Sequence, residues 1–434
     1  MSWSLAQAKH RLNIGQANIY TWLKINMKFK VPLRIGIVQL NPQIGQTKDT
    51  TTRAWKLLDE FQAKNKGRSP DILVFPEFAL TGYSFHDRNH ILPYTSKVGE
   101  GPTYQFAQQV SRKFNCYTVI GYPEKTSDDS KTATLYNSAV MVNSSGDLVF
   151  NYRKSFLYYT DDDWGCQENP MGFQQFEIPV NAQDPDGTTR QIALKTGIGI
   201  CMDLSNYKFE APFTDYEFAT YHLDHGTELL LCPMAWLHSA AITKDTADPQ
   251  EQWSVVQSVL DKYQLPEIGS QGNFEFNLDK PTNVEPMPFE EALSVKSYDN
   301  LDKPDICNIT YWILRFTPFV ALKKRYEWFH SKVLVPYFAH SSNKTYIGSS
   351  LAKPWVHEGK ETVLVLANRC GIEDKKTLYA GSSGIYKFNG RTHGDQDESV
   401  DTTNHSVDFL GNLSKGLEGM IVRDVTLEVE RESE

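Results

Sequence analysis

From Val31 onward, apolar runs with strand character alternate with amphipathic segments of helical character. The run DILVFPEF (71–78) is almost continuously apolar, which is typical of a strand buried on both faces of a sheet. This alternation predicts an α/β fold, in which sheets are covered by helices on their outer faces. The other predicted elements are helices at 47–66, 102–114, 215–225 and 249–263, strands at 33–40, 117–124, 193–201, 227–233, 362–368 and 380–388, and a hairpin at 135–154.

Two parts of the chain fall outside this alternation. The first 30 residues are basic, and no acidic residue precedes Asp49. Residues 274–345 are rich in Asp, Pro and Asn before an aromatic, basic stretch, and we interpret them as an insertion between a helix and the next strand. We therefore predict an N-terminal extension (1–30), one domain (31–428) that carries the insertion, and a short tail (429–434).

An acid-free, basic leader of this kind resembles a mitochondrial transit peptide. An ordinary basic extension would have the same composition, so both interpretations stay open. A start at Met27, just before the first predicted strand, would delete the leader and leave the fold whole. We expect a cytoplasmic protein, which would also enter mitochondria if the leader is a targeting signal.

Composition excludes several classes of function. The formal net charge of −9 gives nucleic acid no electrostatic reason to bind the bulk surface, and anionic membranes none either. No apolar run reaches the roughly 18 residues of a transmembrane helix, and the best candidate (311–329) is broken by Arg315 and Pro318, so no stable membrane insertion is expected. The six cysteines form no CxxC pair and the histidines lack metal-ligand spacing, so we expect reduced thiols and neither a metal ion nor another cofactor.

Three polar side chains stand where predicted buried strands end. Glu77 follows DILVF, Lys154 follows DLVF and NYR, and Cys201 follows GIGI. Taken singly, they could be a helix cap, a solvated hairpin end and a core thiol, because free cysteine is often buried as a small hydrophobe. A carboxylate, an amine and a thiol at strand ends could instead converge at one rim of a sheet, where α/β folds usually build their sites.

The sequence motifs around these three residues resemble those of the nitrilase superfamily. The matching motifs are Pro76-Glu77 with Gly82-Tyr83, Arg153-Lys154, and Ile200-Cys201 with Asp203. The resemblance covers about 31–272 and 346–390, and it implies an α-β-β-α sandwich with a Glu–Lys–Cys catalytic triad. The other five cysteines have no such context, and we interpret them as packing residues.

The resemblance implies a thiol amidase in which each residue has a role. The Cys201 thiol is a poor nucleophile when neutral, so Glu77 would take its proton as a general base. Lys154 and the backbone N–H of Met202 would stabilise the oxyanion of the tetrahedral intermediate. Many family members use a second glutamate after the lysine, and Glu168 is the candidate here. Asp203 is better understood as a structural residue of the cysteine turn than as a catalytic one.

In more detail, the sequence is similar to the branch of this superfamily that deamidates the N-terminal Asn and Gln of proteins. It implies protein or peptide substrates, ammonia release, and products that feed N-degron degradation. An acidic group should then bind the substrate α-ammonium, and Asp163, Glu168 and Asp203 are unranked candidates. An amidase for small free metabolites, of the ω-amidase or carbamoylase type, is the main alternative, and a catalytically silent binding protein is the other. The oligomeric state stays open.

Overall fold

The computed structural model describes residues 26–65, 68–238, 273–275, 303–322, 357–373, 377–391 and 404–432. Within these segments, thirteen strands form one hydrogen-bonded sheet in the order β14-β13-β10-β8-β7-β6-β1-β2-β3-β4-β5, and β15 pairs with both β1 and β9. A second sheet contains β11 and β12. The strands are β1 (Asn26–Gln39), β2 (Ile72–Val74), β3 (Tyr117–Lys125), β4 (Leu135–Val142), β5 (Leu148–Arg153), β6 (Gln175–Gln183), β7 (Thr189–Ile198), β8 (Leu229–Met234), β9 (Asn273–Glu275), β10 (Thr362–Asn368), β11 (Ile372–Glu373), β12 (Thr377–Leu378), β13 (Gly384–Phe388), β14 (Val407–Asn412) and β15 (Gly419–Glu432).

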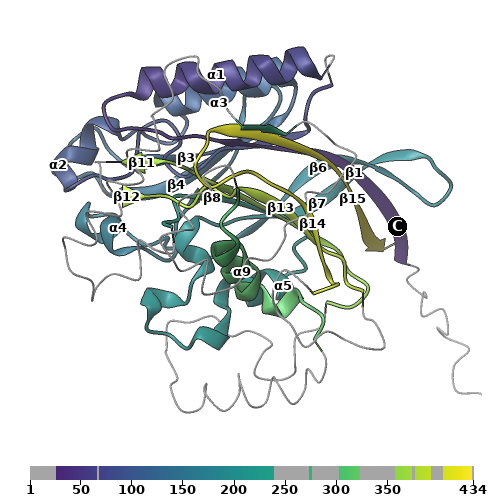
Figure 1. Cartoon of the computed structure of the whole chain (residues 1–434). Helices are drawn as coiled ribbons and strands as arrows, with labels where there is room; N and C mark the ends of the chain where they lie inside the picture. Colours follow the sequence, from purple (N-terminus) through teal and green to yellow (C-terminus); the bar gives the residue numbers. More distant parts are fainter. Residues whose placement is uncertain are drawn as a thin grey trace, which may run out of the picture.

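The large sheet folds back on itself, so that β1 and β3 of one half contact β10 and β8 of the other. Apolar side chains from both halves meet in an inner core, to which Ile35, Val119 and Leu231 contribute. Helices α1 and α3 cover one outer face, and α5 and α9 lie on the opposite side (Figure 1). The predicted α-β-β-α layering is confirmed. The helices are α1 (Thr47–Lys64), α2 (Arg88–Ile91), α3 (Gly101–Phe114), α4 (Tyr159–Asp163), α5 (Glu217–Asp224) and α9 (Ile306–Arg315).

The two helices on the first outer face follow their apolar spacing. In α1, Ala54, Leu58 and Phe61 are buried. In α3, Phe106 and Phe114 point into the same outer core, which lies between the two helices and the sheet. Both helices were predicted within two residues of their observed ends, because side chains four positions apart share one helical face.

Strand β1 is longer than predicted at its N-terminal end. It pairs with β15 in an antiparallel ladder that runs from Asn26 opposite Glu432 to Gln39 opposite Gly419 (Figure 1). The sheet therefore extends past the predicted domain boundaries at residues 31 and 428. Met27 lies inside β1, opposite Arg431. A start at Met27 would thus remove one residue of the strand as well as the leader.

The predicted insertion contains an integral part of the fold. Helix α9 carries a buried apolar face, and Ile309, Trp312 and Ile313 belong to the inner core. Asp305 caps the helix, since its side chain accepts a hydrogen bond from the Asn308 N–H. The composition of residues 274–345 concealed this element, because its 10-residue apolar helix stands among Asp-, Pro- and Asn-rich stretches.

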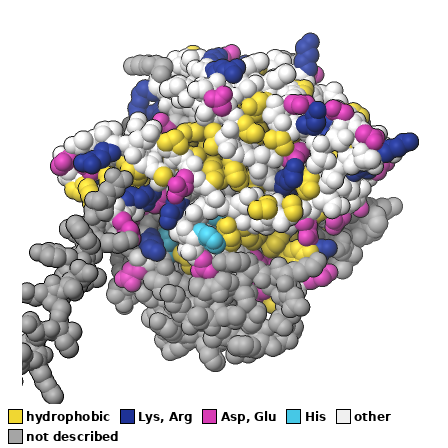
Figure 2. All heavy atoms as spheres, turned by 180° about the vertical axis from the view of Figure 1, so that it is seen from behind, with side chains coloured by type: hydrophobic (Ala, Val, Ile, Leu, Met, Phe, Trp, Pro, Cys, Tyr) yellow, Lys and Arg dark blue, Asp and Glu magenta, His cyan; other side chains and the backbone are white. Residues whose placement is uncertain are grey.

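The described surface carries both signs of charge. Figure 2 shows Lys and Arg side chains interspersed with Asp and Glu on the rear face, with apolar side chains between them. In the part of the chain that the structure describes, no helix combines the length and apolarity needed to span a bilayer. The predicted helix at 249–263 and most of the basic leader lie outside the described residues.

Candidate active site

Four buried polar side chains form one hydrogen-bonded cluster: Glu77 after β2, Asn137 near the start of β4, Lys154 after β5, and Asp161 on α4. The Lys154 ammonium donates to Glu77 Oε1 at 2.9 Å and to Asp161 Oδ2 at 2.7 Å. The Asn137 amide donates to the same two carboxylates, to Glu77 Oε1 at 2.6 Å and Asp161 Oδ1 at 2.8 Å. All four side chains are fully buried. The structure therefore brings Glu77 and Lys154 into direct contact, as their strand-end positions predicted.

Glu77 is held at this place by the backbone of neighbouring strands. Its second oxygen, Oε2, accepts a hydrogen bond of 2.7 Å from the Ala235 N–H, just beyond the end of β8. Gly121 in β3 permits the close approach of the loop, because a Cβ atom there would stand 2.6 Å from the Glu77 Cα. Burial raises the pKa of the Glu77 carboxyl, and Asp161 raises it further, while Lys154 and Asn137 oppose the shift.

Lys154 follows β5 directly and carries the positive charge of the cluster. Burial alone would lower the pKa of its ammonium, but Asp161 and Glu77 outweigh that effect and hold the pKa well above its usual value. Lys154 therefore stays charged at neutral pH. A buried ammonium with two carboxylate partners can stabilise negative charge that develops nearby on a substrate.

Cys201 does not end a strand, as the sequence predicted, but opens a short 3₁₀ helix, η2 (Cys201–Leu204). Strand β7 ends at Ile198, and Cys201 itself has a φ of 44°. This left-handed conformation costs a residue with a Cβ on the order of 1–3 kcal/mol, and such conformations gather at active sites. The chain turns after β7 instead of continuing as a strand, and this turn places the Cys201 thiol at the edge of the sheet.

The Cys201 thiol interacts electrostatically with the cluster. Burial raises its pKa well above the usual value and the Glu77 carboxylate raises it further, whereas Lys154 and the Ala235 N–H favour the thiolate. The resting thiol is therefore protonated at neutral pH. It needs a base before it can attack, and Glu77 is a carboxylate of raised basicity within the same site.

Asp203 fixes the shape of this turn. Its Oδ1 accepts hydrogen bonds from the Ser155 and Phe156 N–H groups at 3.0 and 2.8 Å. Its Oδ2 accepts from the Ile200 N–H at 2.8 Å and the Tyr152 hydroxyl at 2.9 Å. Asp203 thereby ties the segment after Lys154 to the residue before Cys201. Four donors occupy its oxygens, which supports the structural interpretation and leaves it poorly placed to bind a substrate.

The other predicted site residues lie at different distances from the cluster. Met202 is the second residue of η2, so its N–H directly follows Cys201, and its oxyanion role stays a prediction. Asp163 is exposed at the end of α4. Glu168 is also exposed; it accepts a hydrogen bond of 2.7 Å from the Tyr207 hydroxyl and lines a pocket of about 370 Å³. The second carboxylate that contacts Lys154 is Asp161, not Glu168.

The sequence did not identify Asp161 and Asn137 as site residues. Asp161 begins the run DDD, which resembles a solvated turn. Its carboxylate is buried because it occupies the third position of α4, where it accepts from the Tyr158 N–H at 2.9 Å. Asn137 offered a weak signal, since it is a polar amide in a predicted buried hairpin strand.

Tyr83, which belongs to one of the quoted motifs, also faces the cluster. Its hydroxyl accepts a hydrogen bond of 3.4 Å from Thr160 Oγ1. Burial raises the pKa of the Tyr83 hydroxyl well above its usual value, and the negative charges of Asp161, Glu77 and Cys201 raise it further. The Glu373 carboxylate binds the Tyr83 N–H at 3.0 Å, so a residue from β11 supports this side of the site.

The six cysteines are free thiols, and all except Cys307 are buried. Among the described residues, no three His, Cys, Asp or Glu side chains converge as metal ligands would. A buried thiol beside a carboxylate base and an ammonium can carry out acyl transfer through a thioester.

Comparison with known proteins agrees with this chemistry. The profile of the carbon-nitrogen hydrolase family matches residues 34–206, which include Glu77, Lys154 and Cys201. The fold and the site together define an amidase of this class.

Individual relatives and solved structures identify a more specific family within this class. The protein N-terminal amidase of Saccharomyces cerevisiae is 43% identical over 454 residues, which cover 94% of this chain and 98% of the relative. That of Schizosaccharomyces pombe is 33% identical over 220 residues, 48% of this chain and 71% of the relative. A crystal structure of N-terminal amidase with a Gln-Val peptide aligns with a TM-score of 0.81 and 43% identity, over 93% of this chain and 100% of that one. The chain belongs to the protein N-terminal amidase family.

Proposed function

We propose that this protein hydrolyses the side-chain amide of N-terminal Asn and Gln in proteins and peptides, giving Asp or Glu and ammonia. The observation that carries the proposal is the buried contact of Lys154 with Glu77 and Asp161 in one electrostatic unit with the Cys201 thiol. The substrate class is supported by family members of known structure. N-terminal amidase has been crystallised with a Gln-Val peptide and with an Asn-Glu-Ala peptide, and the latter structure is 44% identical to this chain.

The first half of the reaction forms a thioester. Glu77 takes the Cys201 proton while the sulfur attacks the amide carbon of the substrate side chain. The resulting oxyanion is stabilised by the Lys154 ammonium and the Met202 N–H, and each such donor is typically worth roughly 3–4 kcal/mol. The C–N bond then breaks, Glu77 returns its proton to the leaving nitrogen, and ammonia departs.

The second half of the reaction regenerates the thiol. Glu77 takes a proton from water, which attacks the thioester carbon and releases a side-chain carboxylic acid. The thiolate recovers the proton from Glu77. The sum is one amide and one water converted to one carboxylic acid and one ammonia, with no redox change. Asp161 stays bound to Lys154 throughout and keeps the ammonium oriented.

The test is ammonia release from peptides that begin with Asn or Gln, from their N-acetylated forms, and from free asparagine and glutamine. Release confined to peptides with a free N-terminus, lowered about 10⁴-fold or more in Cys201→Ala, supports the proposal. The matched control is Cys116→Ala, which removes a buried thiol that contacts Thr118 on β3. Equal or better turnover of free amides would instead indicate a metabolite amidase, and no release by folded protein would indicate a silent binding protein.

We also propose that the protein acts mainly in the cytoplasm, that the basic leader adds a mitochondrial fraction, and that its products feed N-degron degradation. The acid-free, basic composition before Asp49 supports the mitochondrial fraction, and the acidic residue that the reaction leaves at the N-terminus supports the link to N-degron degradation. Reporter fusions of residues 1–40, with and without the segment before Met27, test the targeting. Uniform cytoplasmic signal from both fusions would contradict the mitochondrial fraction.

A further inference from the structure

Helix α9 lies outside the matched carbon-nitrogen hydrolase segment, yet it contacts one segment that binds Glu77 and one that begins with Cys201. One of these segments is Ala235–His238, whose Ala235 N–H binds Glu77. The other is η2, which begins with Cys201. Because α9 packs on both, its placement bears on where the base and the nucleophile stand relative to each other.

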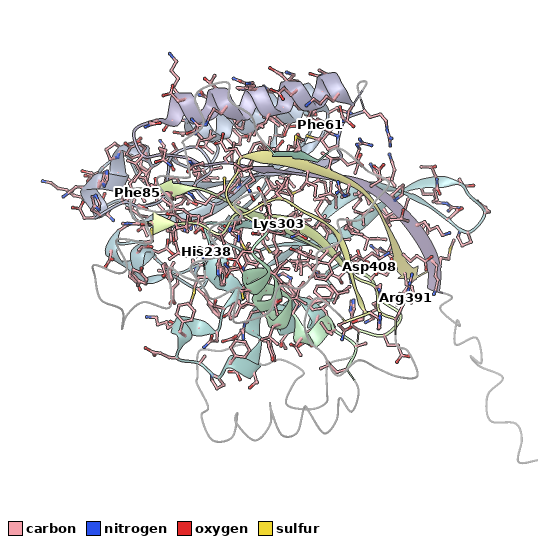
Figure 3. The ribbon with its side chains drawn as sticks, viewed as in Figure 1. Phe61, Phe85, His238, Lys303, Arg391 and Asp408 are labelled. Atoms are coloured by element: carbon pink, nitrogen blue, oxygen red, sulfur yellow. The ribbon has the colours of Figure 1, made fainter. Side chains whose placement is uncertain are left out.

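The N-cap and the first two turns of α9 support the Glu77 side of the site. At its start, Asp305 Oδ2 lies 3.1 Å from Nε2 of His238, which Figure 3 shows beside this end of the helix. One turn on, the Asn308 amide donates to the Leu237 carbonyl at 3.3 Å. The Trp312 ring then packs edge-on against Trp236, with centroids 6.0 Å apart. The helix therefore follows the segment after β8 residue by residue.

The C-terminal end of α9 supports the Cys201 side of the site through Arg315. Its Nε donates to the Leu204 carbonyl at 2.7 Å, and Leu204 is the last residue of η2. Its Nη1 donates to the Phe213 carbonyl, and its Nη2 binds Glu217 Oε2 at 3.1 Å. The Arg315 side chain is almost fully buried, and its guanidinium lies 4.7 Å from the Phe213 ring centroid.

Glu217 extends this connection to the loop that follows the nucleophile. Its other oxygen, Oε1, accepts from the Tyr207 N–H at 3.0 Å. One guanidinium thus joins η2, the 206–217 loop and the first turn of α5. The planar fork of arginine reaches three acceptors in different directions, which a lysine ammonium on a flexible stem cannot reproduce.

We propose that Arg315 is a positioning residue of the amidase reaction, because it fixes η2 and thereby aims the Cys201 sulfur between Glu77 and Lys154. This inference rests on the proposed function for its catalytic readout. The alternative is a buried ion pair that contributes to stability alone. The two differ in whether the reactivity of Cys201 changes in protein that is still folded.

The experiment compares Arg315→Lys with a matched control, Arg53→Lys. Arg53 is also a buried arginine; it binds Glu418 Oε2 at 3.0 Å and the Asn41 carbonyl at 2.9 Å. It lies on α1, in the outer layer opposite α9 (Figure 1). Both variants therefore lose a buried fork, and only one of them loses its connection to η2.

For Arg315→Lys we expect kcat for an N-terminal Gln peptide to fall roughly 10- to 100-fold, because misplacement by about 1 Å can cost about 10²-fold, while KM changes less than about threefold. The rate of Cys201 alkylation by iodoacetamide, followed by mass spectrometry of its peptide, should change as well. Arg53→Lys should have a lower melting temperature than wild type, but its kcat and its alkylation rate should stay within about threefold of the wild-type values. If Arg315→Lys fails to fold, Arg315→Ala with added ethylguanidinium is measured for rescue of alkylation.

Wild-type kcat and alkylation in folded Arg315→Lys would overturn the proposal, as would equal losses in Arg53→Lys. Failure of ethylguanidinium to rescue the alanine variant would also count against it. The alkylation rate separates a failure of the proposed function from a failure of the proposed role of Arg315. A wild-type protein that releases no ammonia contradicts the proposed function, whereas the orientation of Cys201 by Arg315 is still read from alkylation.

Discussion

Two buried aspartates near Cys201 are held in opposite ways. Asp161 binds a cation, Lys154, at 2.7 Å, together with the Asn137 amide. Asp203 binds three backbone N–H groups and the Tyr152 hydroxyl, with no cation among these partners. The first carboxylate adjusts the charge of a reacting group, whereas the second fixes the path of the backbone. Equal burial and equal residue type therefore do not imply equal roles.

Of the two aspartates, Asp161 should give the larger loss of activity when it is replaced by Asn. Loss of this negative charge leaves the buried Lys154 with one carboxylate, so the ammonium is less well held and its pKa falls. We expect kcat to drop about 10²-fold or more. The change in melting temperature should be smaller than that of Asp203→Asn. Steady-state kinetics with N-terminal Asn and Gln peptides check this. Asp162→Asn, which changes the exposed neighbour, is the control and should stay within about threefold of wild type.

Asp203→Asn should give the opposite ratio of stability to activity loss. An amide group must face a backbone N–H or the Tyr152 hydroxyl, so a buried donor loses its acceptor at a cost of about 1–3 kcal/mol. We expect a lower free energy of unfolding and a kcat reduced about 10-fold through the shifted cysteine turn. Urea unfolding and kinetics on the same preparations measure both. If Asp203→Asn were as inactive as Asp161→Asn at unchanged stability, the distinction between the two aspartates would be wrong.

Stability should also depend on pH through Asp203. Burial raises its pKa to about 6 in the folded protein, although hydrogen bonds from Ile200 and Phe156 oppose the shift. Between the unfolded value near 3.9 and this folded value, the native state binds more protons, so stability falls as pH rises, by about 3 kcal/mol in total. Wild type should show this decline between about pH 4 and 6. Asp203→Asn should show less of it, and identical pH profiles would contradict the assignment.

The pH dependence of activity distinguishes the two aspartates further. The raised pKa of Glu77 predicts that kcat/KM decreases on acidification at a pH above the ordinary carboxyl value of 4.5. Asp161 contributes to this shift, so Asp161→Asn should move the acidic limb to lower pH through its residual activity. Asp203→Asn should leave the limb in place. If the acidic limb moved equally in both variants, the pKa of Glu77 would depend on Asp203 as much as on Asp161, and the distinction between the two aspartates would be wrong.

The smallest effect is expected for Glu168→Gln. The exposed Glu168 binds the Tyr207 hydroxyl, and a glutamine oxygen can accept the same bond. We expect kcat and KM within about threefold of wild type. A KM that rises 10-fold for peptides, while the inhibition constant of their N-acetylated analogues stays unchanged, would instead assign the α-ammonium of the substrate to Glu168.

Local patterns predicted the layers and the strand-end residues, and long-range contacts account for what they missed. The spacing of Phe106 and Phe114 located α3, and the motifs around Glu77 and Lys154 located two side chains that are in contact in the structure. Asp161 could not be distinguished from its two acidic neighbours, because only the folded position of Lys154 makes that carboxylate different. Arg315 stood in a stretch interpreted as an insertion, and its acceptors lie about a hundred residues earlier in the chain.

The pairing of β1 with β15 has a consequence for biosynthesis. The strand near the beginning of the described chain finds its longest partner only in the strand near its end. A nascent chain on the ribosome must wait with this edge of β1 unpaired until β15 (Gly419–Glu432) has been translated, and non-local pairing of this kind is slow and exposed to aggregation. Chaperone demand during synthesis, and intolerance of premature stop codons before residue 419, follow from this one ladder.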